Sequence, residues 1–267
     1  MKYSFLLKRT KALVKYYLLK FFTRNKFRDD LDILFKYFIK VKKQHSGVMF
    51  DVGAHLGEVS YNYLKAGFEV YAFEPDLNKN KIELLNRLKK FKNFHLSQLA
   101  ASDTSGKELD FYTSDVSTGI SSALKFHDSH VLSGKVKTIA LRDFINDNGI
   151  KAIDFVKIDT EGYDYFVIKG LGLEKIKPAF IICEYENVKS EVLGYKLQDI
   201  LSYLEKYNYK IIISEWYPIR RYGKKHEWKQ FLFPPDLPDE KSWGNLLAIQ
   251  LPHYSEFSDF IKETWIK

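Results

Sequence analysis

From residue 47 onward, short apolar runs alternate with segments whose apolar residues recur at the spacing of a helix. Repeated strand-helix units favour a parallel sheet covered by helices on both faces. The last two apolar runs follow each other without a helical segment, which predicts an antiparallel hairpin at one sheet edge. The predicted strands are 47–53, 68–75, 94–102, 152–159, 179–186, 209–216 and 245–252, and the predicted helices are 58–67, 76–91, 163–172 and 197–208.

The pattern is less regular between residues 102 and 152. A polar hairpin around Ser105-Gly106 is followed by residues 114–135, which are rich in Ser, Gly and His and show no period. Residues 136–150 then predict a strand leading into a helix. An irregular stretch as long as 114–135 inside a compact domain indicates a loop with a function.

The first 46 residues form a separate basic extension, and residues 47–267 form the main domain. Apolar residues at helical spacing predict amphipathic helices over roughly 3–22 and 28–43, but Lys interrupts every apolar run before it could span a membrane. No cleavage site typical of a signal peptide follows an apolar core. We favour a helical flap that packs on the main domain or on a second subunit of a homo-oligomer. Peripheral contact with an anionic lipid surface is the alternative.

Charge is distributed unevenly along the 267 residues. The net charge is +8, but residues 1–47 hold 13 Lys and Arg against three Asp, a net +10, so the remaining 220 residues sum to −2. A nearly neutral main domain argues against nucleic acid as a partner. The single cysteine, Cys183, lies in an apolar run and cannot form an internal disulfide. We therefore expect a reducing compartment, namely the cytoplasm or the inner face of the membrane.

The segment Asp51-Val-Gly53-Ala-His55-Leu-Gly57 lies where the first predicted strand turns into a helix. Gly53 allows a sharp turn and lets a ligand approach the backbone, while Gly57 lets the helix begin close to its neighbours. Glu74 ends the second predicted strand, where a carboxylate can accept hydrogen bonds from both hydroxyls of a ribose. Together these residues predict a nucleoside-binding cradle.

The spacing of the cradle distinguishes two ligands. A dinucleotide favours G-x-G-x-x-G, whose backbone N–H groups surround a pyrophosphate, whereas this chain has G-x-x-x-G with His55 inside it. Asp51 precedes the turn and suits a ligand that carries a sulfonium and an ammonium group. The cradle therefore predicts S-adenosylmethionine and disfavours a hydride-transferring enzyme.

Five segments resemble, in order and spacing, the FkbM-type methyltransferases. The resemblance covers roughly residues 47–251 and implies a seven-stranded, Rossmann-like class I methyltransferase fold. It also implies O-methyl transfer from S-adenosylmethionine to hydroxyls of sugars, polyketides or other secondary metabolites. One departure is His55, where the family usually has Asn. The segments are "FDVGAHLGEVS", "YAFEPDLNKNKIELLNRL", "LAASDTSG", "DFVKIDTEGYDYFVIKGL" and "GNLLAIQ".

Three carboxylates follow the strands that should neighbour the cradle. Asp159 and Glu161 end the fourth core strand in "VKIDTEG", and Glu184 lies in the fifth. Methyl transfer requires a group that accepts the proton of the attacking hydroxyl, and open α/β sheets place such groups at the carboxyl ends of strands. Each of the three is a candidate catalytic residue. Asp159 or Glu161 could instead cap the next helix, and a divalent metal ion held by Asp159 with Glu161 or Glu184 stays an open alternative.

Other residues are candidates for contacts with ligands. Ala101 and Ser102 follow the third predicted strand, where this fold contacts adenine. His127 and His130 lie in the long loop and could be a base, a ligand or merely solvated. The basic aromatic segment "SEWYPIRRYGKKHEWKQ" could stack on a sugar and bind a diphosphate, or be an exposed loop. The predicted substrate-binding residues are His127, Tyr163, Arg220 and Arg221.

The leading interpretation is an O-methyltransferase that acts on a sugar hydroxyl. The acceptor would be a nucleotide-activated sugar, or a surface polysaccharide or glycolipid. The alternatives are a methyltransferase for a non-sugar metabolite or nucleic acid, and a non-catalytic protein that binds a membrane or a polyanion. Nucleic acid is disfavoured because no Asn-Pro-Pro-Tyr or Asp-Pro-Pro-Tyr sequence is present to hold a flipped base.

Overall fold

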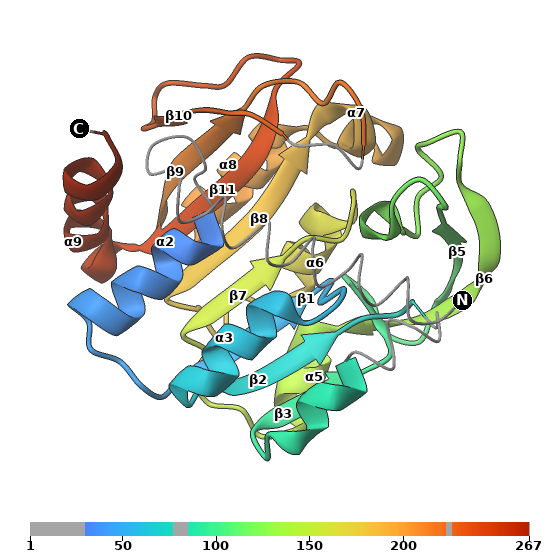
Figure 1. Cartoon of the computed structure of the whole chain (residues 1–267), viewed down its shortest axis with the longest axis horizontal. Coiled ribbons are helices and arrows are strands. Elements are labelled where there is room, and N and C mark those ends of the chain that lie inside the picture. Colours follow the sequence, from blue (N-terminus) through green and yellow to red (C-terminus); the bar gives the residue numbers. More distant parts are fainter. Residues whose placement is uncertain (1–29, 77–84, 223–225, 267) are drawn as a thin grey trace, which may run out of the picture.

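The computed structural model describes residues 30–76, 85–222 and 226–266. An eight-stranded sheet runs through its centre in the order β10-β9-β11-β8-β7-β1-β2-β3 (Figure 1). Neighbouring strands from β3 to β8 in this order pair in parallel, whereas β11 is antiparallel to β8 and β9. The strands of this sheet are β1 Val48–Val52, β2 Glu69–Phe73, β3 Phe94–Ser97, β7 Phe155–Ile158, β8 Phe180–Glu186, β9 Tyr209–Trp216, β10 Trp228–Leu232 and β11 Trp243–Gln250.

Seven of these strands correspond to the seven-stranded fold that the resemblance implied, and they include the predicted antiparallel pair β9 and β11. The difference is β10, an eighth strand that pairs antiparallel with β9 and forms the sheet edge. It arises inside the basic aromatic segment, where no apolar run long enough to predict a strand is visible. The predicted α/β class and its mostly parallel sheet are confirmed.

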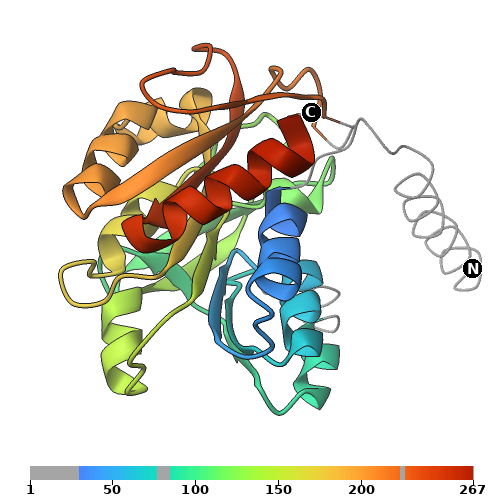
Figure 2. The same ribbon diagram turned by 90° about the vertical axis from the view of Figure 1, so that its left-hand side faces the viewer.

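Helices cover both faces of the sheet, as Figure 2 shows from the side. Apolar side chains alternate between the two faces along each strand, so Phe50 packs with one helical layer and Met49 with the other. One layer holds α5 Leu141–Asp147, α6 Asp164–Gly170 and α8 Leu197–Lys206, and the other holds α2 Asp30–Lys36, α3 Glu58–Ala66 and α9 Leu251–Ile261. Short helical turns are α7 Asn187–Ser190, η1 Tyr37–Val41, η2 Arg87–Lys90, η3 Thr118–Ile120, η4 Glu191–Leu193 and η5 Lys262–Ile266.

The third predicted strand, 94–102, was wrong as a single element. Its first part is β3 in the main sheet, and its last part is β4 Ala100–Ser102 in a second sheet of order β4-β6-β5. The long loop 114–135 is also shorter than predicted, because β6 Val131–Ala140 begins within it and pairs with β5 Glu108–Thr113. This small sheet and η3 stand beside the carboxyl ends of the main strands (Figure 1).

The predicted helix 28–43 is present from Asp30, as α2 and the wider turn η1. Ile33 and Tyr37 are fully buried against the main domain, where Tyr37 packs edge-on to Phe257 of α9. This part of the extension therefore packs as a flap, as we favoured. The predicted helix 3–22, and most of the predicted helix 76–91, lie outside the described residues.

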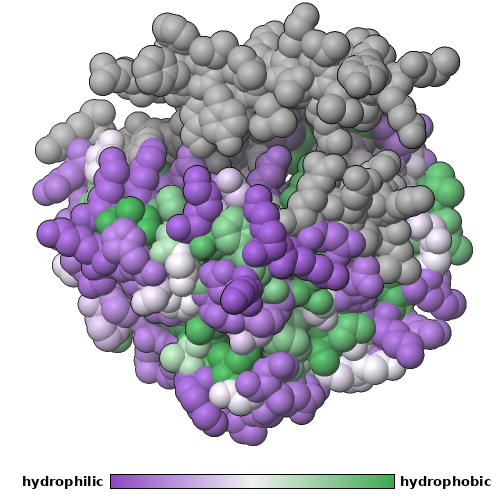
Figure 3. All heavy atoms as spheres, turned by 60° about the horizontal axis from the view of Figure 1, so that its bottom comes forward, coloured by the Kyte–Doolittle hydropathy of each residue, from purple (hydrophilic) through white to green (hydrophobic). Residues whose placement is uncertain are grey.

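Among the described residues, no helix combines the length and apolarity needed to cross a bilayer. Figure 3, which brings the lower side of Figure 1 forward, shows a mainly hydrophilic face with separate hydrophobic patches. Peripheral membrane contact through the first 46 residues and a cytoplasmic location stay predictions.

Candidate active site

Backbone contacts with two strands fix the glycine turn. Gly53 lies in the left-handed region (φ +74°), and a Cβ placed on it would come 1.8 Å from the Asp159 carbonyl oxygen. The N–H groups of Gly53 and Ala54 both donate to the Phe73 carbonyl, at 2.9 and 3.1 Å. The turn is therefore packed between β7 and β2, with no space for a side chain. Gly57 is also left-handed and lies against Leu88.

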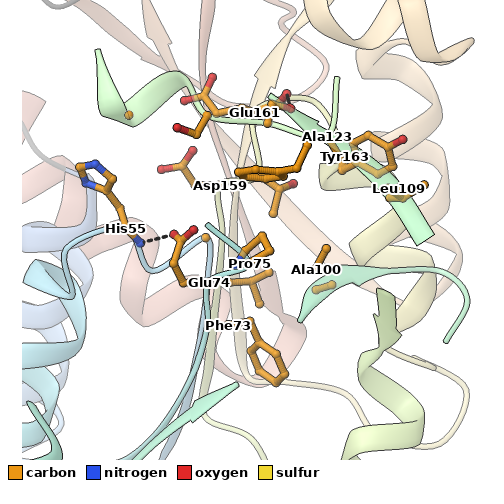
Figure 4. Close-up of a pocket in the computed structure, with 18 residues that line it drawn as sticks. His55, Phe73, Glu74, Pro75, Ala100, Leu109, Ala123, Asp159, Glu161 and Tyr163 are labelled. Carbon is orange, nitrogen blue, oxygen red and sulfur yellow. Dashed lines mark hydrogen bonds between the residues drawn. The ribbon is translucent and has the colours of Figure 1, made fainter. Parts of the chain in front are cut away.

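Glu74 links the turn to the end of β2. Its carboxylate accepts a hydrogen bond from the N–H group of His55 at 2.8 Å (Figure 4). It also accepts one from the N–H group of Asp76 at 2.9 Å. His55 adopts a left-handed conformation (φ +50°) unusual for a residue with a side chain, and its Nε2 lies 3.0 Å from Thr118 Oγ1. A carboxylate at this position, at the end of β2, can accept hydrogen bonds from ribose hydroxyls.

Asp51, before the glycine turn, is enclosed by the protein interior. It is fully buried, and its Oδ2 accepts from Ser60 Oγ at 2.6 Å and Ser60 N at 3.2 Å. Its Oδ1 lies 3.6 Å from the ammonium of Lys157. The predicted direct contact of Asp51 with a cofactor is thus replaced by a structural role, because both oxygens face the protein interior.

Lys157 is a buried cation that was not among the predicted site residues. Its Nζ donates to the Gly53 carbonyl at 2.6 Å and lies 3.4 Å from Asp159 Oδ2. Burial opposes its charge, but Asp159 and Asp51 raise the pKa of Lys157 above its usual value. Lys157 therefore connects the glycine turn, its buried acid and the end of β7. A lone Lys in the apolar run "DFVKID" is the signal that could have identified it.

A cavity of about 180 Å³ opens above the turn. One end is polar, where His55, Glu74 and Asp159 face it, and the other is apolar, with Leu109 and Tyr163 (Figure 4). A polar end for a ribose and an amino-acid moiety and an apolar end for a purine fit S-adenosylmethionine. The wall residues are Val52, Gly53, His55, Phe73, Glu74, Pro75, Ala100, Ala101, Leu109, Phe111, Gly119, Ser121, Ser122, Ala123, Asp159, Thr160, Glu161 and Tyr163.

Of the predicted adenine contacts, Ala101 lies on this wall and Ser102 does not. The Ser102 carbonyl instead meets Gly170 of α6, where an added Cβ would come within 2.0 Å. Ala100, Leu109 and Phe111 were missed because they belong to the small sheet. The prediction of a single third strand concealed that sheet.

The three predicted catalytic carboxylates converge. Asp159 and Glu161 point into the cavity from the loop after β7 (Figure 4). One oxygen each of Asp159, Glu161 and Glu184 lies within 4.8 Å of the others. Glu184 lies behind Glu161, away from the cavity wall. Neither Asp159 nor Glu161 caps helix α6, which has no side-chain cap. The carboxylate of Asp164, the first residue of α6, instead accepts from the N–H groups of Thr160 and Gly162 in the preceding loop.

Glu161 combines a strained backbone with a shifted pKa. Its φ of +55° lies in the left-handed region, which costs a residue with a side chain about 1–3 kcal/mol and occurs often at functional sites. Burial raises the pKa of Glu161 to about 7, although the neighbouring Lys189 ammonium opposes the shift. A carboxyl group with this pKa can exchange a proton near neutral pH.

Lys189 is the second buried cation, with a side chain 2 % exposed. Its Nζ lies 2.5 Å from Glu161, 3.0 Å from Glu184 and 2.7 Å from Glu186. A divalent ion bound by Glu161 and Glu184 would need oxygen distances of about 2.0–2.6 Å. It would then lie next to this ammonium and be repelled by it. The predicted alternative of a metal ion therefore does not fit the residues as they are arranged.

His127, His130, Arg220 and Arg221 do not line the cofactor cavity. His127 Nδ1 is 2.7 Å from Ser129 Oγ, and its ring meets that of Tyr222 edge-on at 5.3 Å. His130 is buried, and burial lowers its pKa. Arg220 and Arg221 are exposed and line none of the described cavities. Lys224 and Lys225 lie outside the described residues. Binding of substrate by His127, Arg220 and Arg221 stays a prediction.

The comparison with protein families agrees with the S-adenosylmethionine site that the geometry indicates. The methyltransferase FkbM domain model matches residues 51–211, and the chain belongs to this family. It is thus an S-adenosylmethionine-dependent methyltransferase. A search of curated proteins found no match.

Solved methyltransferases are similar at low sequence identity. Magnesium protoporphyrin IX methyltransferase from Synechocystis PCC 6803, with bound SAM, is 11% identical with a TM-score of 0.44, and the match covers 82% of this chain and 77% of that chain. Precorrin-6y C5,15-methyltransferase from Geobacter metallireducens is 15% identical (TM-score 0.39; coverage 77% and 80%). A putative RNA methyltransferase from Pyrococcus horikoshii is 14% identical (TM-score 0.41; coverage 82% of each chain).

Replacing Gly53 tests the packing of the turn. Gly53→Ala should destabilise the protein by several kcal/mol, because a left-handed alanine costs about 1–2 kcal/mol and the clash with the Asp159 carbonyl adds about 1–3 kcal/mol. Gly106→Ala is the matched control, since Gly106 has a similar φ (+79°) and no atom within 4 Å of its Cβ position. Urea unfolding measures both variants. Equal losses of stability would show that the clash is relieved without cost.

Replacing Glu74 tests recognition of the cofactor. Glu74→Gln should weaken S-adenosylhomocysteine binding by roughly 10- to 100-fold, since an amide presents an NH₂ to one of two backbone donors and loses the charge. Glu69→Gln, at the other end of β2, is the control and should bind normally. Calorimetry gives both affinities. Unchanged affinity in Glu74→Gln would remove Glu74 from the cofactor site.

Proposed function

We propose that this methyltransferase transfers the methyl group to a hydroxyl oxygen of a neutral, polyhydroxylated acceptor, namely a sugar unit of a glycan or glycolipid. The observation that supports this acceptor is a second cavity, of about 490 Å³, which shares Ser121 with the cofactor cavity. Thr118, on its wall, also contacts His55 of the cradle. The two cavities therefore meet at η3.

Hydroxyl and carboxylate groups dominate the walls of the second cavity. The hydroxyl groups can both donate to and accept from sugar hydroxyls, and the carboxylates accept from them. Three carboxylates disfavour a diphosphate, which makes a nucleotide-activated sugar the less suitable form of the acceptor. The wall residues are Asp76, Thr113, Ser114, Asp115, Thr118, Ser121, Asp128, Ser129 and Val131.

The chemistry divides between the cofactor and the protein. Bound S-adenosylmethionine supplies a methyl group already activated by its sulfonium. The protein must hold the acceptor hydroxyl in line and accept its proton. Glu161 suits the second task, because it faces the cavity and its pKa is about 7. Asp159 faces the same cavity, and its half-exposed carboxylate can pass a proton to water.

The pH dependence of the reaction tests Glu161 as the base. Only the ionised carboxylate can accept a proton, so kcat/KM should rise about tenfold per pH unit up to about 7 and then level. Glu161→Gln should lower kcat by roughly 10²–10⁴-fold and remove this limb of the profile, while S-adenosylhomocysteine affinity stays normal. Asp159→Asn serves as the comparison. If Glu161→Gln retains full turnover and the same profile, another group accepts the proton.

An acceptor panel tests the substrate class. Methyl transfer from labelled S-adenosylmethionine should occur with neutral glycans and glycolipids and be weaker with nucleotide sugars. Asp128→Ala should raise the KM of the acceptor about tenfold, the value of one lost hydrogen bond, without changing cofactor affinity. Asp110→Ala, an exposed acid on β5 that pairs with Lys135, is the control. Transfer to RNA or to a phenol, with glycans inert, would contradict the proposal.

A further inference from the structure

The Lys189 ammonium is enclosed by carboxylates: it donates hydrogen bonds to Glu161 and Glu184 and forms an ion pair with Glu186. An ammonium has three donors and no acceptor, and the Lys189 ammonium has three carboxylate partners, Glu161, Glu184 and Glu186. The rings of Phe126 and Tyr222 lie 5.2 and 5.9 Å from it and close its remaining sides. A cation held this completely is part of the site and is not a mobile surface charge.

The partners of Lys189 come from segments far apart in the sequence. Glu161 belongs to the loop after β7, Glu184 and Glu186 to β8, and Lys189 itself to α7. The Tyr222 hydroxyl donates to Glu186 at 3.2 Å, which adds the segment after β9. Lys189 therefore joins the wall of the cofactor cavity, through Glu161, to β8 and to the segment after β9.

Three carboxylates in and beside this cluster lie close enough together to hold a metal ion, and two of them, Glu161 and Glu184, contact Lys189. Asp159, Glu161 and Glu184 present oxygen atoms within 4.8 Å of one another, a grouping of hard ligands that suits Mg²⁺ or Mn²⁺. Their repulsion must be compensated, because buried like charges are costly without a cation. Lys189 supplies that cation from the protein itself.

We propose that the Lys189 ammonium is the resident cation of this carboxylate cluster, which takes the place of a divalent metal ion and positions Glu161 toward the cofactor cavity. The claim that Lys189 positions Glu161 to accept a proton rests on the proposed function. The claim that Lys189 takes the place of a metal ion rests only on the arrangement of the carboxylates around it. Lys189 acts through Glu161 and is a positioning residue.

Manganese binding tests this assignment without any turnover. The metal-free wild-type protein, treated with EDTA and dialysed, should leave the electron paramagnetic resonance signal of added Mn²⁺ unchanged. Lys189→Ala leaves the carboxylates without their cation and should bind one Mn²⁺ at least about tenfold more tightly than wild type. Adding Glu184→Gln to Lys189→Ala should remove this binding. Lys135→Ala, which frees the exposed Asp110, is the control and should behave as wild type.

Two results would overturn the proposal. One is wild-type protein that binds Mn²⁺ stoichiometrically, or that loses turnover in EDTA and regains it with Mg²⁺. The other is Lys189→Ala that still binds S-adenosylhomocysteine, and is therefore folded, but gains no Mn²⁺ affinity. If Lys189→Ala does not fold, the wild-type Mn²⁺ titration alone decides. Because the Mn²⁺ signal is read without an acceptor, failure to methylate any sugar would count against the proposed function only.

Discussion

The arrangement of the site depends on the contact between the Lys157 ammonium and the Gly53 carbonyl. This 2.6 Å hydrogen bond joins the end of β7 to the turn after β1, and the same ammonium compensates Asp51 below the turn and Asp159 above it. A buried lysine is tolerated only where it is paired, so the two carboxylates and the carbonyl must lie where they do. The glycine turn, the buried Asp51 and the acidic loop after β7 are thus parts of one electrostatic unit.

Two of the four described non-glycine residues with left-handed backbones lie in the site. His55 and Glu161 both have left-handed backbones, and both side chains reach the cavity wall. Such conformations persist only if the surroundings compensate their cost. His55 is held by the Glu74 carboxylate through its N–H group, and Glu161 is held by Lys189 through its side chain. Each strained residue therefore has a charged partner from another segment.

The sequence predicted the parts of the site that depend on local pattern. Gly53, Gly57 and Glu74 could be identified because a strand-turn-helix unit needs them at fixed spacing, and the mostly parallel sheet followed from the repeated strand-helix units. The structural role of Asp51 could not be predicted from the local pattern. Its side chain faces the interior because it contacts the side chains of Ser60 and Lys157. Lys189 lies in the polar stretch "NVKSEV", where nothing in the sequence indicates that its partners come from other segments.

The two carboxylates of the loop after β7 pair with different buried lysines and differ in their exposure. Asp159 pairs with Lys157 at 3.4 Å and is half exposed, so its carboxylate is compensated from the cradle side and open to water. Glu161 pairs with Lys189 and is largely buried, while it still lines the cavity. Of the carboxylates in the cluster around Lys189, Glu161 is the one that also faces the cofactor cavity. A proton taken up there enters a cluster in which carboxylates outnumber the cation, and this excess negative charge favours its uptake. Burial is the largest cause of the raised pKa of Glu161, and this buried position on the cavity wall suits Glu161 to accept a proton.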